Sequence, residues 1–433
     1  MWFGAADPVT AATAAEHSVA QMIHDAGREH TAVRVAYITM LFPSASETFA
    51  TGDVRALVVR GVEMSVHSLR LALPTTPGLA MEREVDRVPR TYNRGWRSLG
   101  RSLVVAAKRP RVALDLFGAI VRYCAPRPEH LVKSLILAPR VLEAFDELQC
   151  ERPDVVHAFW SNYPALVVYL VQRYMPGVVT SISFGAHDIL EQYGFSRPVA
   201  SEADFVRTLA CVNVHQVERG FGIPADVIEV VYNGVDLERL PPPADRVPRS
   251  IVTAGRLVED KGVDQVIRAL ARLRERWTDA SLRVLGDGPL LPQLRTLAEH
   301  LGVADAVRFE GHVSHAQLLE AMRRAEVLMF LSETDYDRLP NVVKEGMVCG
   351  CVCVVTDTDG IDELITHGVS GFVVKRGDVE AAVRHVDDVF AGRVPVEGVA
   401  LEAEARIRGA FDRQVSVRRY QERWTELVAR KRA

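Results

Sequence analysis

Short apolar runs alternate with stretches of helical spacing through the first half of the chain. Strand-like runs occupy residues 34–40, 64–69, 154–159, 178–182, 210–213 and 227–231. Helical patterns lie between several of them, for example at residues 46–60 and 163–174. Strands that alternate with helices pair in parallel, because the helix returns the chain to the starting end of the sheet. We therefore predict a doubly wound α/β domain here.

The same alternation begins again after a proline-rich segment, residues 241–248, whose composition is typical of a linker. Strand-like runs follow at residues 251–254, 282–285, 307–310, 327–331, 351–356 and 371–374. Apolar residues between the first two runs fall on one helical face: Val263, Val266, Ile267, Leu270 and Leu273. The pattern predicts a second doubly wound sheet of about six strands.

These patterns divide the chain into four parts. We expect an N-terminal extension at 1–32, a first Rossmann-like domain at 33–240, a second at 241–410 and a terminal helix at 411–433. The first domain contains an unusual stretch at about 90–140. It has eleven Lys and Arg residues but only two acidic residues, which gives it a net charge of +9. Its interleaved apolar residues predict a basic amphipathic helical insertion. Such an insertion lies either on an anionic membrane surface or against its own domain.

Composition narrows the function classes. The whole chain has a net charge of −4, which gives no reason to expect a nucleic-acid partner. No apolar run approaches the ~20 residues that span a bilayer, and the first residues do not resemble a signal peptide. We therefore expect a cytoplasmic protein, with the inner face of the membrane as a second option.

Three cysteines, Cys349, Cys351 and Cys353, alternate at the start of a predicted strand. Alternate residues of a strand share a face, and a free cysteine packs as a small hydrophobic residue. A metal site would need further His or Cys ligands, and the sequence offers none nearby. We expect a buried core position for these thiols and no metal cofactor.

The stretch from Asp337 to Gly350 is the one on which the functional argument depends. An apolar strand, 327–331, is followed by a polar loop, 332–338, and Pro340 then suits the first turn of a helix over 341–348. Gly350 is a plausible C-cap. The helix N-terminus offers N–H groups to a phosphate, and Glu345 can point back toward it. Carboxylates there suit sugar hydroxyls, although an acidic first turn that merely complements the helix dipole remains an alternative.

Several motifs occur in a fixed order at strand-to-helix junctions. They are Ser46-Glu47-Thr48-Phe49, Asn233-Gly234-Val235-Asp236, Gly255-Arg256-Leu257 with Lys261-Gly262, Gly286-Asp287-Gly288-Pro289, Gly311-His312-Val313, and Asp337 to Glu345. Together they resemble a GT-B glycosyltransferase of family 4 (glycosyl transferases group 1), in its polysaccharide-building branch. The resemblance covers roughly residues 33–430.

The resemblance implies two domains that face each other across a cleft, with the last helix crossing back to the first domain. It implies that Arg256 and Lys261 hold the diphosphate of a nucleotide sugar. It places the following residues at the nucleotide and sugar: Gly286, Gly288, His312, Val313, Leu339, Pro340, Asn341 and Glu345. Catalytic roles fall to Asp337, Glu345 and His187, and Ser46, Glu47 and Asp188 lie on the acceptor side. Asp359 and Gly360 would frame the sugar.

The chain departs from the family pattern at two places. Asp337 replaces a glutamate that most relatives have, which shortens its reach to the sugar. Gly185 stands where relatives commonly have a histidine on the acceptor side, and His187 follows two residues later. His187 either assumes that role or is simply solvated. His157 also matches a family histidine, but its place within a strand favours the core.

The resemblance predicts a retaining glycosyltransferase that moves a sugar from a UDP- or GDP-linked donor to a glycan or lipid-linked acceptor, without a metal. A peripheral contact with an anionic membrane is one further expected interaction. A nucleotide-sugar epimerase of the same architecture, a non-catalytic nucleotide-sugar-binding protein and a membrane-surface scaffold remain alternatives.

Overall fold

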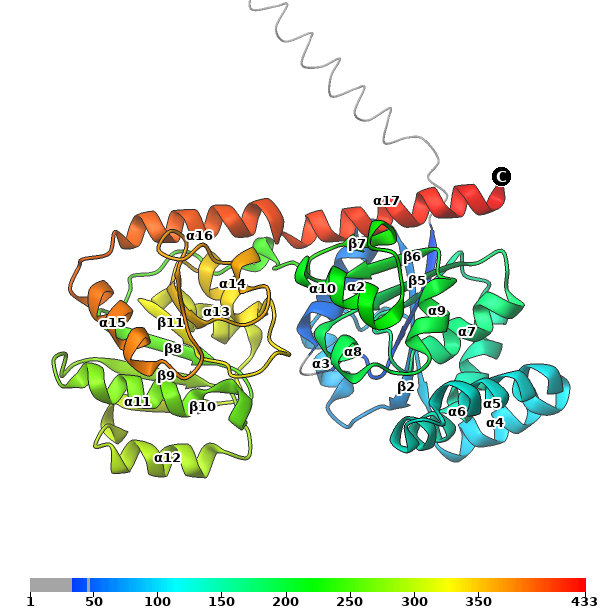
Figure 1. Ribbon diagram of the computed structural model, residues 1–433, viewed down its shortest axis with the longest axis horizontal. Coiled ribbons are helices and arrows are strands. Elements are labelled where there is room, and N and C mark those ends of the chain that lie inside the picture. The colour runs from blue at the N-terminus through cyan, green and yellow to red at the C-terminus, as the bar shows by residue number, and fades with distance from the viewer. Residues whose placement is uncertain (1–32, 45–46) are drawn as a thin grey trace, which may run out of the picture.

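Two parallel sheets, each covered by helices on both faces, form the two halves of the molecule (Figure 1). The computed structural model describes residues 33–44 and 47–433, so the predicted extension at 1–32 and Ser46 lie outside the described residues. The first sheet has the order β3-β2-β1-β4-β5-β6-β7. Its strands are β1 (Arg34–Thr39), β2 (Glu63–Leu71), β3 (Arg90–Asn93), β4 (Val155–Ala158), β5 (Val179–Phe184), β6 (Phe205–Thr208) and β7 (Ile228–Val230).

Helices connect these strands. They are α2 (Thr48–Val59), α3 (Thr76–Glu82), α4 (Trp96–Lys108), α5 (Pro110–Cys124), α6 (Pro128–Glu151), α7 (Ala165–Tyr174), α8 (Ala186–Glu191), α9 (Ser196–Ser201) and α10 (Val212–Phe221). The strand order reverses between β1 and β4, so the loops that follow these two strands diverge and leave a crevice at the carboxyl edge.

The second sheet has six strands in the order β10-β9-β8-β11-β12-β13, as the sequence predicted. They are β8 (Ser250–Ala254), β9 (Ser281–Leu285), β10 (Val307–Gly311), β11 (Val327–Phe330), β12 (Val352–Thr356) and β13 (Phe372–Val374). The helices are α11 (Val263–Arg274), α12 (Leu291–His300), α13 (His315–Arg324), α14 (Asn341–Val348), α15 (Val379–Phe390), α16 (Val396–Ala410) and α17 (Arg413–Arg432). Here the order reverses between β8 and β11, and the loops after these strands carry Arg256, Lys261 and Asp337.

Two local predictions were wrong. The run at 210–213 is not a strand, because the sheet uses β6 just before it and α10 begins at Val212. A short apolar run fits either a strand or a buried helical turn. The real strand, β6, contains the charged Arg207, so its sequence does not read as a continuous apolar run. The basic stretch is helical from Trp96, as predicted, but it opens with the edge strand β3 and its last helix continues to Glu151.

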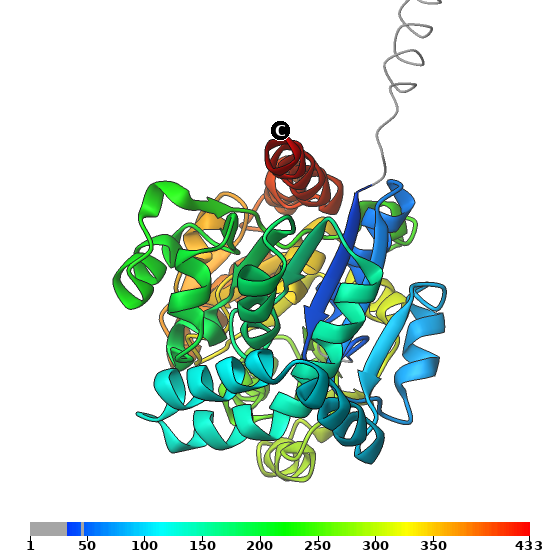
Figure 2. The same ribbon diagram turned by 90° about the vertical axis from the view of Figure 1, so that its right-hand side faces the viewer.

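A buried polar cluster joins α6 to the first sheet. His67 of β2 lies 3.1 Å from Glu147 and 3.1 Å from Glu151, and Arg140 lies 3.0 Å from Glu147. Burial opposes the charge on His67, but its bonds to the two glutamates outweigh burial and raise the pKa of its ring. This cluster anchors the three helices α4–α6 at one end of the first half, far from α17 (Figure 2).

The chain crosses between the halves twice, at adjacent places. The first crossing contains Val235 and the second contains Phe411 to Arg413. The Val235 N–H donates to Phe411 O at 2.7 Å, and the Arg413 N–H donates to Val235 O at 3.0 Å. After the second crossing α17 runs along the first half, where Tyr420 and Trp424 are buried in its core. In Figure 1 α17 is visible in red above the first sheet, next to α16 above the second sheet.

The three alternating cysteines occupy the core of the second half, as expected. Cys349, Cys351 and Cys353 are buried in one cluster with residues of α14 and β12. Burial raises the pKa of Cys349 and of Cys351 to about 12, so both thiols stay protonated and inert at neutral pH.

Candidate active site between the two halves

The helix α14 is built as its sequence predicts. Pro340 precedes its first residue with φ −61°, and Gly350 ends it in the left-handed region at φ +81°, where glycine is favoured. The N-terminus of α14 therefore lies at the carboxyl edge of the second sheet, directly after the loop from β11. That position directs backbone N–H groups and the positive end of the helix dipole toward the other half.

Lys261 and Asp337 meet at this edge, although 76 residues separate them. The Lys261 ammonium donates to the Asp337 carboxylate, which also accepts from the Ser332 hydroxyl at 2.7 Å. Both side chains are mostly buried, at 13% and 18% exposure. Each of these two predicted site residues is therefore the partner of the other, and a phosphate bound at Lys261 would share the ammonium with Asp337.

Arg256 is placed differently from Lys261. It is exposed on the loop after β8, and its side chain makes no hydrogen bond or ion pair with any residue in 33–44 or 47–433. The loop itself is held tightly, because a Cβ on Gly286 would lie 1.9 Å from Gly255 O and one on Gly288 would lie 2.4 Å from Leu257 O. A free guanidinium on a fixed loop is well placed to bind an anion.

Glu345 lines a cavity of about 270 Å³ between the two halves. Its wall is formed by α2, the crossing at 234–239, the start of α13 and the start of α14. The Glu345 carboxylate accepts from His315 Nε2 at 2.8 Å. Sequence reasoning missed His315. A capping box of Ser314 and Gln317 marked its helix start, but nothing in the sequence paired it with Glu345.

The remaining predicted donor residues lie around this edge. Asn341 lines the cavity and its Oδ1 accepts from Lys344 Nζ at 3.2 Å. His312 is exposed in the loop after β10, Val313 and Leu339 are half-buried, and Pro340 is buried. Asp359 of the neighbouring loop lies 3.7 Å from Arg338.

Lys344 fixes α14 to the crossing between the halves. It is buried, and its Nζ donates to the Asn233 carbonyl at 2.9 Å. Burial, together with the nearby Arg413, lowers the pKa of Lys344 to about 7. Lys344, which directly precedes Glu345, thus connects the candidate donor site to the crossing between the two halves.

On the side of the first half, Glu47 precedes α2 and accepts from the Trp160 indole N–H at 2.8 Å. Asp188 is fully buried, and its Oδ2 accepts from the Gly185 N–H at 2.9 Å. Burial raises the pKa of Asp188 to about 7. Asp188 therefore holds the start of α8, and the structure places it beneath the acceptor-side surface and not on it.

His187 lies on the exposed side of α8 and contacts the other half. Its ring centroid is 5.6 Å from that of Tyr336, whose hydroxyl donates to Glu191 at 3.3 Å. The loop that contains Asp337 thus reaches across to α8. Among the described residues, His187 makes no hydrogen bond or ion pair with Asp337 or Glu345, the other two predicted catalytic residues.

Two further contacts close the space between the halves. Arg338, the neighbour of Asp337, is buried and donates to Asn213 of α10. The Glu363 carboxylate accepts from the N–H groups of Cys211 and Val212 at 2.7 Å and 2.9 Å, at the start of α10. Sequence reasoning missed both, because each partner lies more than a hundred residues away.

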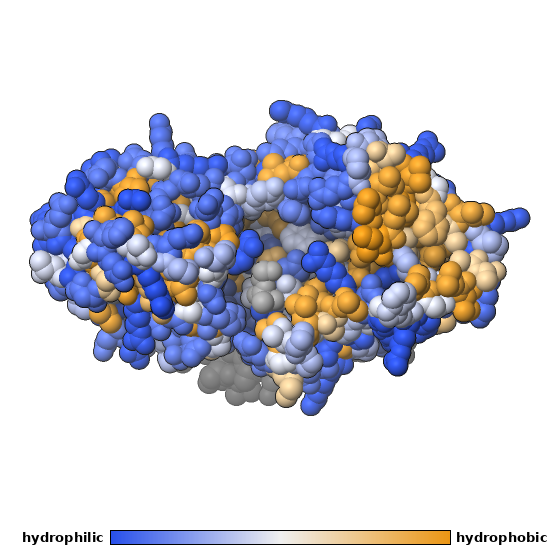
Figure 3. Space-filling model, turned by 90° about the horizontal axis from the view of Figure 1, so that it is seen from below, coloured by the Kyte–Doolittle hydropathy of each residue, from blue (hydrophilic) through white to orange (hydrophobic). Residues whose placement is uncertain are grey.

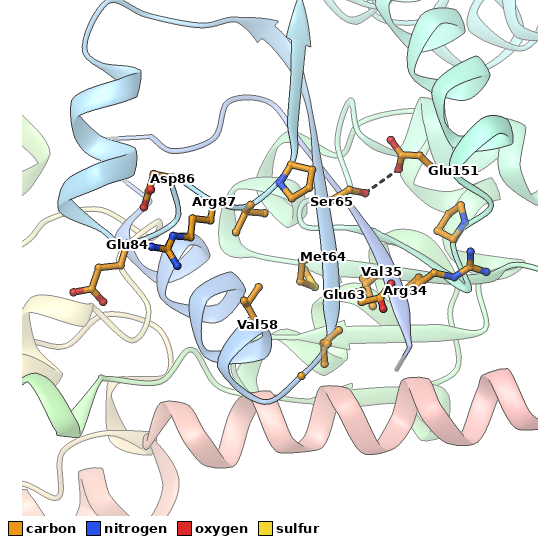
Figure 4. Close-up of a pocket in the computed structure, with 15 residues that line it drawn as sticks. Arg34, Val35, Val58, Glu63, Met64, Ser65, Glu84, Asp86, Arg87 and Glu151 are labelled. Carbon is orange, nitrogen blue, oxygen red and sulfur yellow. Dashed lines mark hydrogen bonds between the residues drawn. The ribbon is translucent and has the colours of Figure 1, made fainter. Parts of the chain in front are cut away.

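A different cavity, of about 990 Å³, lies at the amino ends of β1 and β2 (Figure 4). Charged residues of both signs line it, among them Arg34, Glu63, Glu84 and Arg87. The only hydrogen bond that Figure 4 draws runs from the Ser65 hydroxyl to Glu151, at 2.9 Å. Ligands of parallel sheets bind at the carboxyl ends of strands, so this cavity does not belong to the candidate site.

No helix within residues 33–44 and 47–433 combines the length and the apolar character needed to cross a bilayer. Among the same residues, no three His, Cys, Asp or Glu side chains are grouped so that they could hold a metal ion.

Relatives with curated names resemble the chain over much of its length. It is 30% identical to a glycogen synthase of Mycobacterium tuberculosis, over 61% of this chain and 66%, just under two thirds, of the relative. It is 26% identical to a putative colanic acid biosynthesis glycosyltransferase, WcaL, of Escherichia coli, over 82% of this chain and 90% of the relative.

Solved structures share the fold. The Anabaena protein Alr3699/HepE, determined in complex with UDP and glucose, superposes with a TM-score of 0.67 at 16% identity, covering 90% of this chain and 98% of that one. The family model described as glycosyl transferases group 1 matches residues 239–406, the half that carries Arg256, Lys261, Asp337 and Glu345. The chain therefore has the GT-B fold, and its second half carries a glycosyl transferases group 1 domain over residues 239–406.

Proposed function

We propose that the protein is a retaining glycosyltransferase that moves a sugar from a nucleotide-sugar donor to a hydroxyl of a glycan or lipid-linked acceptor. The observation that carries the proposal is that the strand order reverses once in each sheet, and that candidate residues follow the strands at these points. The loops after β8 and β11 carry Arg256, Lys261 and Asp337 at the carboxyl edge of the second sheet, and Glu345 lines the cavity between the halves. The named relatives that build polysaccharides support a role in glycan biosynthesis.

The chemistry follows from where charge develops. As the glycosidic bond breaks, negative charge grows on the departing diphosphate, and preorganised cations stabilise it there. Arg256 can bind two phosphate oxygens in a fork, and Lys261 adds a point charge. The N-terminus of α14 adds its dipole. We propose that these groups replace a divalent metal, and that the departing phosphate assists attack on the same face of the sugar.

Glu345 would accept hydrogen bonds from the donor ribose, and His315 would keep its carboxylate oriented. Asp337 would contact the donor sugar once the phosphate shares Lys261. Contacts such as those of Tyr336 with α8 would exclude water from the closed site, which limits hydrolysis of the donor.

The donor base is tested by thermal denaturation with UDP, GDP, ADP, CMP and dTDP. A ligand at about 100 times its dissociation constant stabilises a protein by roughly 2.7 kcal/mol, which is a clear shift. We expect UDP or GDP to raise the melting temperature and the other nucleotides to have little effect. No shift with any of the five would contradict the proposed donor site.

The reaction type is tested by NMR of the product formed from the responding nucleotide sugar. A retaining transferase gives a new glycoside with the anomeric configuration of the donor. Interconversion of the sugar without an acceptor would indicate an epimerase instead. Nucleotide binding without turnover of any acceptor would indicate a non-catalytic binding protein.

A membrane-proximal acceptor is favoured by the surface of α4–α6. Each helix has an apolar stripe of helical spacing that remains exposed: Trp96, Leu99 and Leu103 on α4, Leu114, Phe117 and Val121 on α5, and Val132, Leu135 and Ile136 on α6. Figure 3 shows an extended apolar area on this end of the molecule, on the side from which the hollow between the halves is also seen. Exposed apolar area rimmed by cations is typical of contact with an anionic membrane surface. We therefore propose that the enzyme works at the inner face of the membrane.

Vesicle sedimentation tests this contact. We expect binding to vesicles of phosphatidylcholine with 30% phosphatidylglycerol, and exchange of Arg94, Arg97 and Arg101 for glutamine should weaken binding at least tenfold, because each cation near the surface contributes about 1 kcal/mol. Leu401→Ser removes an exposed leucine of α16, at the other end of the molecule, and should change nothing. Equal binding by the triple variant would contradict the contact.

A further inference from the structure

Trp160 occupies a special place in the first sheet. It lies just after β4, and the strand order reverses between β1 and β4. Its side chain is half-buried, in contrast to the neighbouring Phe159, which is fully buried. The loops after these two strands border the crevice at the carboxyl edge, where ligands of such sheets bind. An indole at this point is therefore available to a ligand in the crevice.

The indole is held from one side by Glu47. Its Nε1–H donates to Glu47 Oε1 at 2.8 Å, and Glu47 directly precedes α2. The first turns of α2 line the cavity that also contains Glu345. Phe49 and Phe159 pack edge-on against Trp160, with ring centroids 5.9 Å and 4.7 Å away. The ring is thus fixed next to the start of α2, whose first turns line that cavity.

On the other side the ring lies over Gly185. A Cβ at position 185 would lie 2.3 Å from Trp160 Cζ3 and 3.1 Å from Cη2, closer than real contacts allow. The backbone does not require glycine there, because φ is −105°, a value that any residue adopts. Glycine is needed because the indole occupies the space. A side chain at 185 would therefore force the indole of Trp160 out of this position.

We propose that Trp160 is a substrate-binding residue, whose indole face packs against a pyranose ring of the acceptor, with Glu47 and Gly185 as its positioning residues. The proposal deepens the proposed function and rests on it. One face of a pyranose carries C–H groups, which are attracted to the electron-rich face of an aromatic ring. Sugar-binding clefts combine such an apolar surface with a few fixed polar groups, and Asp188 and Glu47 already hold this surface rigid.

The proposal explains the unusual glycine. A side chain at 185 would itself contact the substrate. Because residue 185 is glycine, the indole of Trp160, which follows the neighbouring strand β4, occupies that space instead. The acceptor side would therefore recognise a sugar by stacking of its ring on Trp160. A polar side chain at 185 would recognise it by a hydrogen bond instead. Acceptors with an accessible C–H face should be preferred over small alcohols.

Fluorescence of Trp160 gives a direct test. Methyl glucoside, methyl mannoside and methyl galactoside serve as probes at 10–100 mM, in the presence of the nucleotide that shifts the melting temperature. We expect at least one glycoside to quench the emission of the wild type. The signal should vanish in Trp160→Phe, which retains a ring but not the indole. No quenching by any glycoside, or equal quenching in Trp160→Phe, would overturn the proposal.

A double-mutant cycle tests the role of Gly185. In transfer assays, Trp160→Ala should raise the acceptor KM at least tenfold, and Gly185→Ala should raise it similarly because its Cβ displaces the indole. In the Trp160→Ala background, Gly185→Ala should cost less than twofold, since the ring that it would displace is absent. Additive losses would overturn the positioning role of Gly185.

Donor binding separates this proposal from the proposed function. All three variants should keep the nucleotide-induced thermal shift of the wild type, because Arg256 and Lys261 are untouched. A wild type with no shift and no transfer would refute the glycosyltransferase proposal, whatever Trp160 does. A wild type that transfers sugar, together with a Trp160→Ala variant of unchanged acceptor KM, would refute only the role of Trp160.

Discussion

Exchange of Arg256 for alanine is expected to lower kcat/KM for sugar transfer by about 10²–10³-fold, the usual effect of removing one preorganised charge donor from a transition state. Arg256 is exposed on a loop held by close backbone packing, and it has no partner among the described residues, so its removal should leave the fold unchanged. The loss should appear mainly in kcat, because negative charge on the diphosphate increases as the bond breaks. Initial-rate kinetics with the identified donor measure it.

Two variants serve as controls for Arg256. Arg256→Lys keeps the charge but not the fork of N–H donors, so it should recover only part of the rate. Arg268→Ala removes an exposed arginine of α11 that is 4.0 Å from Asp264, and it should keep full activity. Glu345→Ala should likewise lower the rate of transfer strongly. Full activity in both Arg256→Ala and Glu345→Ala would show that the donor site lies elsewhere.

Exchange of Arg413 for methionine is expected to lower the free energy of unfolding by about 3–5 kcal/mol, because it leaves a buried carboxylate without its partner. Arg413 Nη1 donates to Asp53 Oδ1 at 2.6 Å and to the Phe49 carbonyl at 3.0 Å. Asp53 is 2% exposed, and burial raises the pKa of its carboxyl despite the cations around it. Urea unfolding followed by tryptophan fluorescence measures the loss.

Controls distinguish the pair from a general effect on α17. Arg418→Met changes an exposed arginine of the same helix and should alter the unfolding free energy by less than about 0.5 kcal/mol. Adding Asp53→Asn to Arg413→Met should recover part of the loss, since no buried charge then remains. A loss below about 1 kcal/mol for Arg413→Met would show that the ion pair does not hold the two segments together.

The sequence predicted what depends on local patterns. Apolar runs gave the six strands of the second half, and Pro340 and Gly350 marked the ends of α14, because chain geometry alone determines these features. It failed where two states fit one pattern, as at residues 210–213. The sequence also assigned Lys261 and Asp337 separate roles, at the diphosphate and in catalysis, whereas in the fold the two side chains are in contact.

Side-chain partners that belong to separate elements of one half could not be predicted. His315 and Glu345 lie on different helices, and Trp160 and Gly185 follow different strands. Their proximity depends on strand order, which one sequence does not specify. Gly185 is the clearest case, since the sequence shows only that a side chain is missing. The structure shows which ring occupies the space.

The return of α17 to the first half has a consequence for synthesis. Trp424 Nε1 donates to the Ser181 hydroxyl at 3.2 Å, across 243 residues of sequence. At 5–20 residues per second, the ribosome needs roughly 10–50 s to make that interval. During this time the second half can fold while the first still lacks Tyr420 and Trp424 from its core. A premature stop before residue 420 therefore removes part of an internal core and not a dispensable tail.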